Sequence, residues 1–223
     1  PSPAGPSNPI FISLTSLPIV VEQEPANNDR SKPQPLTLPC EVAGRFHPDR
    51  DADWFSFTGK KGQAYSVEVF SERLTLATDP AVLVEFVGVD DTGKETVRTV
   101  IEQDEPAQRF SNNRPFDILT HDPAVQFTAD ADGTYRIAVR DLYAGSLAQQ
   151  RNVYRLVVQP SVPDFQLLAT CKQLVQYADL QSPAYPTGPT LRRGGTQSMV
   201  VQAYRRGGFT GPISLSSEGL PAG

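Results

Sequence analysis

Apolar and polar residues alternate with a period of two along much of this chain, and this alternation restricts the fold more than any other feature. In AYSVEVF, the side chains of Tyr65, Val67 and Val69 fall on one face of an extended strand, and polar residues fall between them. The segments GTYRIAVRDL and NVYRLVV repeat the pattern. Each is typical of a strand with one buried face, whereas helical periodicity is weak. The 21 prolines and 16 glycines predict many turns between the strands.

Many short strands separated by turns, with little helix, predict an all-β fold, namely a jelly-roll-like β-sandwich. The segment WFSFTGKKGQAYSVEVF (54–70) predicts a β-hairpin, because the glycines of its turn can take a positive φ. A second pair of strands is expected in residues 79–100, on either side of the polar turn Asp91-Thr92-Gly93.

A boundary is predicted near Pro160 and Pro163, which interrupt the alternation directly after a strand. Beyond it, DFQLLA, GTQSMVVQAYRR and GPISLSSEGLPAG predict the opening strands of a second, partial β unit. Two or three strands cannot close a sandwich, so we expect this unit to be truncated. We therefore divide the chain into a flexible lead-in (1–18), a β-sandwich (19–160) and the start of a second β-domain (161–223).

The composition argues against several classes of function. The net charge is −5 and the pI is near 5.1, so little offsets phosphate repulsion from nucleic acid or an anionic membrane. No run approaches the ~20 apolar residues that a membrane-spanning helix needs. No HExxH or GxSxG motif is present, and we predict that the chain is not an enzyme. Cys40 and Cys171 lack zinc-site spacing, and the sequence leaves open whether they form a disulfide or remain thiols.

Two groups of oxygen-bearing side chains lie on either side of the first expected strand. The candidate ligands are Glu22, Glu24, Asn27, Asn28, Asp51 and Asp53. Residues two apart in an extended segment point the same way, so each group presents its oxygens together. If the two segments lie side by side, their carboxylates and an amide converge, which suits the oxygen ligands of calcium better than zinc. The alternative is a pair of solvated turns in which Asp53 caps the backbone locally.

The order of several segments resembles the bacterial pre-peptidase C-terminal (PPC) domain. VEQEPANND is followed by LPCEVAGRFHPDRDADWFSFTGKKGQAYSVEVF, and later by DGTYRIAVRDL and YRLVV. The resemblance covers residues 20–160, more than half of the chain, and is strongest to the variety found in long exported planctomycete proteins. The segment LRRGGTQSMVVQAYRRGGFTGPISLSSEGLPAG is similar to the start of the immunoglobulin-like repeat that often follows in such proteins.

The resemblance implies a jelly-roll-like β-sandwich that is exported and usually non-catalytic. The similar collagen-binding domains of clostridial collagenases bind calcium through acidic and amide residues of an N-terminal segment, together with aspartates at the start of a strand. The acidic positions that match here are Glu22, Glu24, Asp51 and Asp53. The usual pattern runs from Glu-Pro directly into Asn, whereas Ala26 intervenes here. This departure leaves open whether Asn27 or Asn28 is the ligand, or whether the site is lost.

We therefore expect a non-catalytic module of a larger secreted, periplasmic or cell-surface protein, with Ca²⁺ as its cofactor. It would aid folding or anchoring of the parent protein or position its substrate, with no binding of nucleic acid and no membrane insertion. The alternative is an adhesion-type module that binds a polysaccharide or an extracellular protein through Trp54 and Tyr143, because aromatic rings stack on such ligands. Trp54 has the opposite parity to Phe55 and Phe57, so its ring is expected to face outward or towards a neighbouring element.

Overall fold

The chain divides into two units, Pro1–Ser161 and Val162–Gly223, which are described separately. The computed structural model describes residues 12–48, 50–106, 120–143, 151–171, 194–196 and 198–219. Most of the expected lead-in (1–18) lies outside the described residues. In the part of the chain that is described, no helix has the length and apolar character needed to cross a bilayer.

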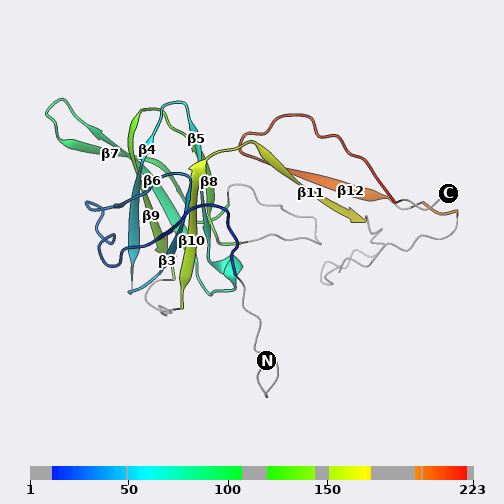
Figure 1. Ribbon diagram of the computed structural model, residues 1–223, viewed down its shortest axis with the longest axis horizontal. Coiled ribbons are helices and arrows are strands. Elements are labelled where there is room, and N and C mark those ends of the chain that lie inside the picture. The colour runs from blue at the N-terminus through cyan, green and yellow to red at the C-terminus, as the bar shows by residue number, and fades with distance from the viewer. Residues whose placement is uncertain are drawn as a thin grey trace, which may run out of the picture. The chain divides into compact units, whose positions relative to one another are not determined.

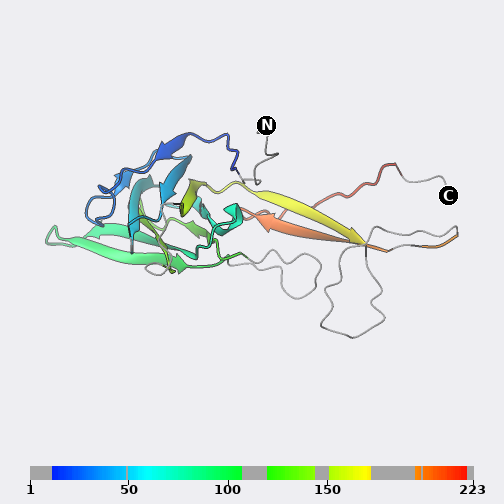
Figure 2. The same cartoon turned by 90° about the horizontal axis from the view of Figure 1, so that it is seen from below.

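The first unit consists of two five-stranded sheets packed face to face (Figure 1, Figure 2). The first sheet has the order β1 (Ile19–Val21), β3 (Cys40–Arg45), β10 (Val153–Pro160), β5 (Ala64–Phe70), β8 (Ala124–Thr128). The second sheet has the order β2 (Gln34–Pro35), β4 (Ala52–Gly59), β9 (Gly133–Asp141), β6 (Pro80–Val89), β7 (Glu95–Gln103). The predicted all-β sandwich is therefore confirmed.

The core lies between the two sheets and is filled by every second residue of the central strands. Its fully buried side chains include Phe55, Val67, Val69, Ile137, Val139, Leu156 and Val158. These are the positions that the alternating pattern placed on the buried faces. Cys40 is a free thiol in the same core, and burial raises the pKa of this thiol to about 11. The side chain of Cys171 lies outside the described residues.

The predicted hairpin between residues 54 and 70 is wrong. β4 pairs with β2 and β9 in the second sheet, whereas β5 pairs with β10 and β8 in the first sheet. The turn between them therefore crosses from one sheet to the other. Alternation places a strand's apolar face towards the core, but both sheets face the same core, so the pattern does not identify the partner strand. The second expected pair is confirmed, because β6 and β7 are antiparallel neighbours around residues 90–94.

Among its described residues, the second unit contains one antiparallel pair, β11 (Asp164–Cys171) and β12 (Met199–Arg206). Side chains at Phe165, Leu167 and Val201 remain partly exposed. Residues 211–219, which the sequence predicts as a further strand, contain no strand in the structure. Within residues 162–171, 194–196 and 198–219, no further strand supplies the second layer that a sandwich requires. Assignment of this unit to an immunoglobulin-like repeat stays a prediction.

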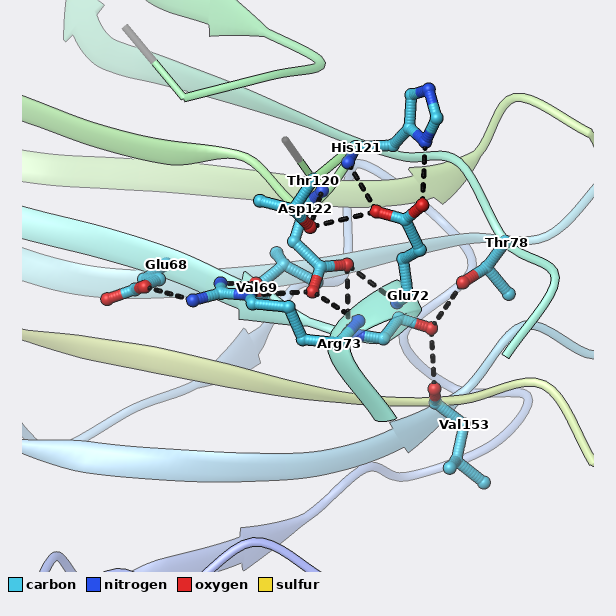
Figure 3. Close-up of polar contacts among 10 residues, drawn as sticks. Glu68, Val69, Glu72, Arg73, Thr78, Thr120, His121, Asp122 and Val153 are labelled. Carbon is cyan, nitrogen blue, oxygen red and sulfur yellow. Dashed lines mark hydrogen bonds and ion pairs between the residues drawn. The ribbon is translucent and has the colours of Figure 1, made fainter. Parts of the chain in front are cut away.

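A network of buried polar groups ties the single-turn 3₁₀ helix η1 (Glu72–Leu74) to the residues before β8 (Figure 3). The fully buried Asp122 carboxylate accepts hydrogen bonds from the backbone N–H groups of Ser71 (3.0 Å), Glu72 (2.7 Å) and Arg73 (3.0 Å), and from the Arg73 Nε (2.9 Å). In return, the Glu72 carboxylate accepts from the His121 backbone N–H at 2.6 Å. The two turns therefore hold each other in place through reciprocal carboxylates.

The same network accounts for the side chains of His121, Asp122 and Ser71 as parts of a polar turn. Both Asp122 oxygens bind backbone or arginine donors, and the His121 ring contacts Glu72 at 3.0 Å. The buried Ser71 hydroxyl bonds to the Thr78 hydroxyl (2.7 Å) and donates to the Val153 carbonyl (2.8 Å). Its hydrogen is therefore already used within the fold.

Substitution Asp122→Asn is expected to lower the free energy of unfolding by about 3 kcal/mol, because an amide nitrogen would face buried N–H donors and leave them unsatisfied. Urea denaturation of both proteins measures the change. Asp90→Asn is the matched control, since Asp90 also accepts from turn residues Thr92 and Lys94, but at a fully exposed site. Equal losses in the two variants would contradict the role assigned to burial.

Candidate metal centre

The two oxygen-rich segments meet at one edge of the sandwich. Residues 18–36, here called the ribbon, include β1 at the edge of the first sheet and β2 at the edge of the second sheet. The ribbon therefore crosses from one sheet to the other, beside the start of β4 (Figure 2). The Asn27 carbonyl accepts a hydrogen bond from the Trp54 backbone N–H at 2.8 Å, which fixes the ribbon against β4.

Three carboxylates converge where the ribbon passes β4. Glu24, Asp51 and Asp53 each offer an oxygen that lies within 4.8 Å of the others. Asp53 has the same parity as Phe55, so its carboxylate points inward and has no exposed surface, and Asp51 is 7% exposed. None of the ion pairs among the described residues involves these three groups. This cluster could hold a metal ion.

Several oxygens at this position have no hydrogen-bond partner. In this part of the structure, the buried oxygens without a hydrogen-bond partner are Glu24 Oε1, Asn27 Oδ1, Asn28 Oδ1 and Asp51 Oδ1. Asn27 has no exposed surface, and its amide nitrogen donates to Asp53 Oδ1 at 2.8 Å, which leaves its oxygen as a buried free acceptor. Each unsatisfied buried acceptor costs about 1–3 kcal/mol. Oxygen donors of this kind fit a hard cation, and Glu24, Asp51 and Asp53 lie close enough together to share one.

Glu22 lies beside the three carboxylates but is held by different partners. Its Oε1 accepts from the Arg45 backbone N–H at 2.8 Å, and its Oε2 lies 3.1 Å from the Tyr154 hydroxyl. The same hydroxyl lies 2.8 Å from Asp53 Oδ2. One hydroxyl hydrogen can be donated to only one carboxylate at a time. Tyr154 therefore bridges Glu22 and Asp53 but cannot neutralise both.

Sequence reasoning missed Tyr154 and Gly44 as parts of this centre. Tyr154 has the parity of Leu156 and was therefore assigned only to the core, and its ring is indeed fully buried. Gly44 is its partner across β3 and β10. A Cβ atom at Gly44 would overlap the Tyr154 ring and the Glu22 carboxylate. A glycine opposite a tyrosine on neighbouring strands is the signal that could have suggested this close approach.

Burial and nearby charges raise the pKa values of Asp53, Asp51 and Glu22. Burial, followed by the charge of Asp51, raises the pKa of Asp53 to about 8. Burial, followed by the charge of Glu24, raises the pKa of Asp51 to about 7. Burial also raises the pKa of Glu22. The metal-free centre therefore holds protons near neutral pH, and a cation would replace them.

Ala26 does not remove the amides from this part of the structure. The Gln23 carbonyl accepts from the backbone N–H groups of Ala26 (2.7 Å) and Asn27 (3.3 Å), so the extra residue lies in a turn. The side-chain oxygens of both Asn27 and Asn28 are buried and free after this turn. Both Asn27 and Asn28 therefore keep a free side-chain oxygen despite the inserted Ala26.

The aromatic candidates lie elsewhere on the unit. Trp54 is partly exposed on the outer side of β4, as its parity predicts, and the Arg30 guanidinium lies 5.6 Å from the centre of its ring. Arg30 in turn forms two hydrogen bonds to Glu85 (2.6 and 3.0 Å). Tyr143 follows β9 and is 44% exposed. A ligand-binding role for Trp54 and Tyr143 stays a prediction.

Comparison with known proteins gives limited similarity. No family model matches the chain, and no curated protein matches it. Among solved structures, the PPC domain of a collagenase from Bacillus anthracis aligns with a TM-score of 0.36 and 13% identity, covering 56% of this chain and 93% of that chain. CorA, a surface-associated copper-binding protein of Methylomicrobium album BG8, aligns with a TM-score of 0.37 and 8% identity, covering 65% and 98%. One of these structures is a PPC domain, the family that the sequence resembles.

Proposed function

We propose that residues 19–160 form a non-catalytic, calcium-stabilised accessory module of a larger secreted, periplasmic or cell-surface protein. The observation that carries this proposal is the buried centre itself. It combines three carboxylates with amide oxygens, four of its acceptor atoms have no partner, and no arginine or lysine forms an ion pair with its three carboxylates among the described residues.

The donor set favours calcium over other common cations. Calcium accepts about six to eight oxygens in flexible geometry, whereas magnesium demands a near-octahedral shell and keeps several waters. Zinc prefers nitrogen and sulfur, and the described residues of the centre offer neither a histidine nor a cysteine. Glu24, Asp51 and Asp53 would hold the ion, with Asn27 and Asn28 adding neutral oxygens.

The burial of the centre supports a structural rather than a catalytic role for the ion. Asn27 and Asp53 have no exposed surface, so little room remains for a substrate at the ligands. A bound ion would join Glu24 of the ribbon to Asp51 and Asp53 of the sandwich. It would thereby stabilise the folded state, which alone assembles the site. The module would then anchor or position the rest of the parent protein.

Calcium at about 100 times its Kd is expected to stabilise the protein by about 2.7 kcal/mol and to raise Tm by roughly 5–10 °C. EDTA should reverse the shift, and differential scanning calorimetry measures both. Glu24→Gln should abolish most of the response, because it removes a ligand charge from the ribbon. Asp91→Asn removes the same charge from the exposed turn between β6 and β7 and should leave the response intact. A melting curve that stays unchanged across millimolar calcium would remove the metal proposal.

A further inference from the structure

The ribbon closes the outer edge of β3 in the first sheet. The Pro18 carbonyl accepts from the Glu41 N–H at 2.9 Å, and the Glu22 N–H donates to the Ala43 carbonyl at 3.1 Å. The Glu22 side chain then continues the same row, because its Oε1 accepts from the Arg45 N–H. Backbone groups of β3 that would otherwise be unpaired are therefore satisfied by the ribbon.

The ribbon also closes the outer edge of β4 in the second sheet. The Asn27 carbonyl accepts from the Trp54 N–H at 2.8 Å, and the Leu36 N–H donates to the Ser56 carbonyl at 2.7 Å. Leu36 is only 8% exposed, and Val20 packs against the core. Release of the ribbon would expose both apolar side chains and would leave β3 and β4 as open edge strands.

Open edge strands bind other strands, and the segment that fits the edges of β3 and β4 is the ribbon itself. The ribbon of a second copy would reproduce the hydrogen bonds, the buried Leu36, the packed Val20 and the carboxylate positions described above. We propose that two copies of this chain exchange their ribbons, so that each ribbon closes the β3 and β4 edges of the other copy, and that a cation at the centre prevents the exchange. This inference rests on the proposed calcium site.

The connection that must open is short. Residues 37–39 join β2 to β3, and Thr37 within it is exposed. In an exchanged dimer every contact of the ribbon is made again with the partner, so the two forms differ mainly in this connection and in the entropy of association. Exchange of an identical element is therefore a low-cost route to a dimer.

The cation acts on the rate of exchange and not on the balance between the two forms. The same centre is built in the closed monomer and in the exchanged dimer, so an ion binds both equally and shifts neither. Glu24 must nevertheless leave Asp51 and Asp53 before the ribbon can move. A bound ion holds these groups together, whereas without it no ligand bond opposes their separation. Chelation should open the exchange, and calcium restored afterwards should trap its product.

The test uses two full-length variants of different tag mass, each in a Cys171→Ser background. One carries Val21→Cys and the other Ala43→Cys, positions that are partners across β1 and β3. The fully buried Cys40 is retained. The variants are mixed at high concentration, either in calcium throughout or in EDTA followed by calcium, and are then treated with a short thiol cross-linker. A mixture of Val21→Cys with Thr58→Cys is the control, because Thr58 is exposed on β4 but is not opposite Val21.

The expected result is a cross-linked heterodimer only after the EDTA step, with the molar mass from light scattering doubled and the doubling retained in calcium. If no cross-linked heterodimer forms after chelation, the proposed exchange is wrong. The same holds if the chains associate but the two variants do not cross-link. Equal cross-linking in calcium and after EDTA would show that the cation does not prevent the exchange, and would overturn that part of the proposal. Calorimetric calcium titration of the unmodified chain separates the two proposals. Calcium binding without exchange retains the proposed function and rejects this inference, whereas absence of calcium binding rejects the proposed function.

Discussion

Gly44→Ala is expected to lower the free energy of unfolding by about 3 kcal/mol or more and to abolish stabilisation by calcium. A methyl group at this position would overlap the Tyr154 ring and the Glu22 carboxylate, both of which lie against the glycine. Overpacking of a buried site alone costs about 1–3 kcal/mol. Movement of the tyrosine would also break its contacts with Asp53 and Glu22. Urea denaturation with and without calcium measures both effects.

The matched control for this prediction is Gly59→Ala. A methyl group there would overlap the ring of Tyr135, which lies in the core among Phe57, Phe86 and Phe127. This variant should lose comparable stability, because the same kind of overlap is created. It should nevertheless keep its response to calcium, since Tyr135 touches none of the candidate ligands. If both variants lost the calcium response equally, Gly44 and Tyr154 would have no special part in the centre.

The metal-free protein is expected to lose stability as the pH rises from about 4 to about 9. The folded-state pKa values of Asp53 (about 8) and Asp51 (about 7) lie above the ordinary value of 3.8. The folded state therefore binds more protons than the unfolded state between these limits. The contribution to stability is complete below the ordinary pKa and is lost as the pH passes through the raised values. The loss is expected to be on the order of several kcal/mol.

Calcium should reverse this dependence, because the ion binds the ionised carboxylates and takes the place of the protons. The stabilisation by calcium should therefore grow between pH 5 and pH 8, by an amount on the order of the loss in its absence. Urea denaturation across this range, with metal-free and calcium-loaded protein, checks both curves. Asp53→Asn should flatten the metal-free curve, since it removes the group with the larger raised pKa. If the stability of the metal-free protein stays constant or rises with pH, the raised pKa values of Asp51 and Asp53 do not govern its stability.

Strand positions followed from the sequence more readily than strand partners did. Alternation identified the buried residues of β5, β9 and β10, because a sheet with one buried face imposes a period of two on any strand. The same rule placed Trp54 outside the core. It could not show that β4 and β5 belong to different sheets, because a hairpin and a crossing between sheets bury the same residues.

The candidate centre was also only partly visible in the sequence. Spacing and residue type brought together Glu24, Asp51 and Asp53, since carboxylates two apart point the same way and the two segments flank one strand. Tyr154 comes from the far end of the chain and has the pattern of an ordinary core residue, so nothing local separates it from Leu156. Glu22 has the same residue type and spacing as Glu24, yet its carboxylate is directed to Arg45 and Tyr154.

Sequence alone determined the class of fold, the inward faces of its strands and the residue types available for a cation, because periodicity and side-chain chemistry are local properties. Only the tertiary structure decided that a single ribbon closes the edges of both sheets, that Gly44 makes room for Tyr154, and that four acceptor oxygens are buried without partners. Tyr154 lies more than 100 residues after Glu22 and Asp53 in the chain, and the ribbon meets strands of two different sheets, so a one-dimensional pattern carries no record of these contacts.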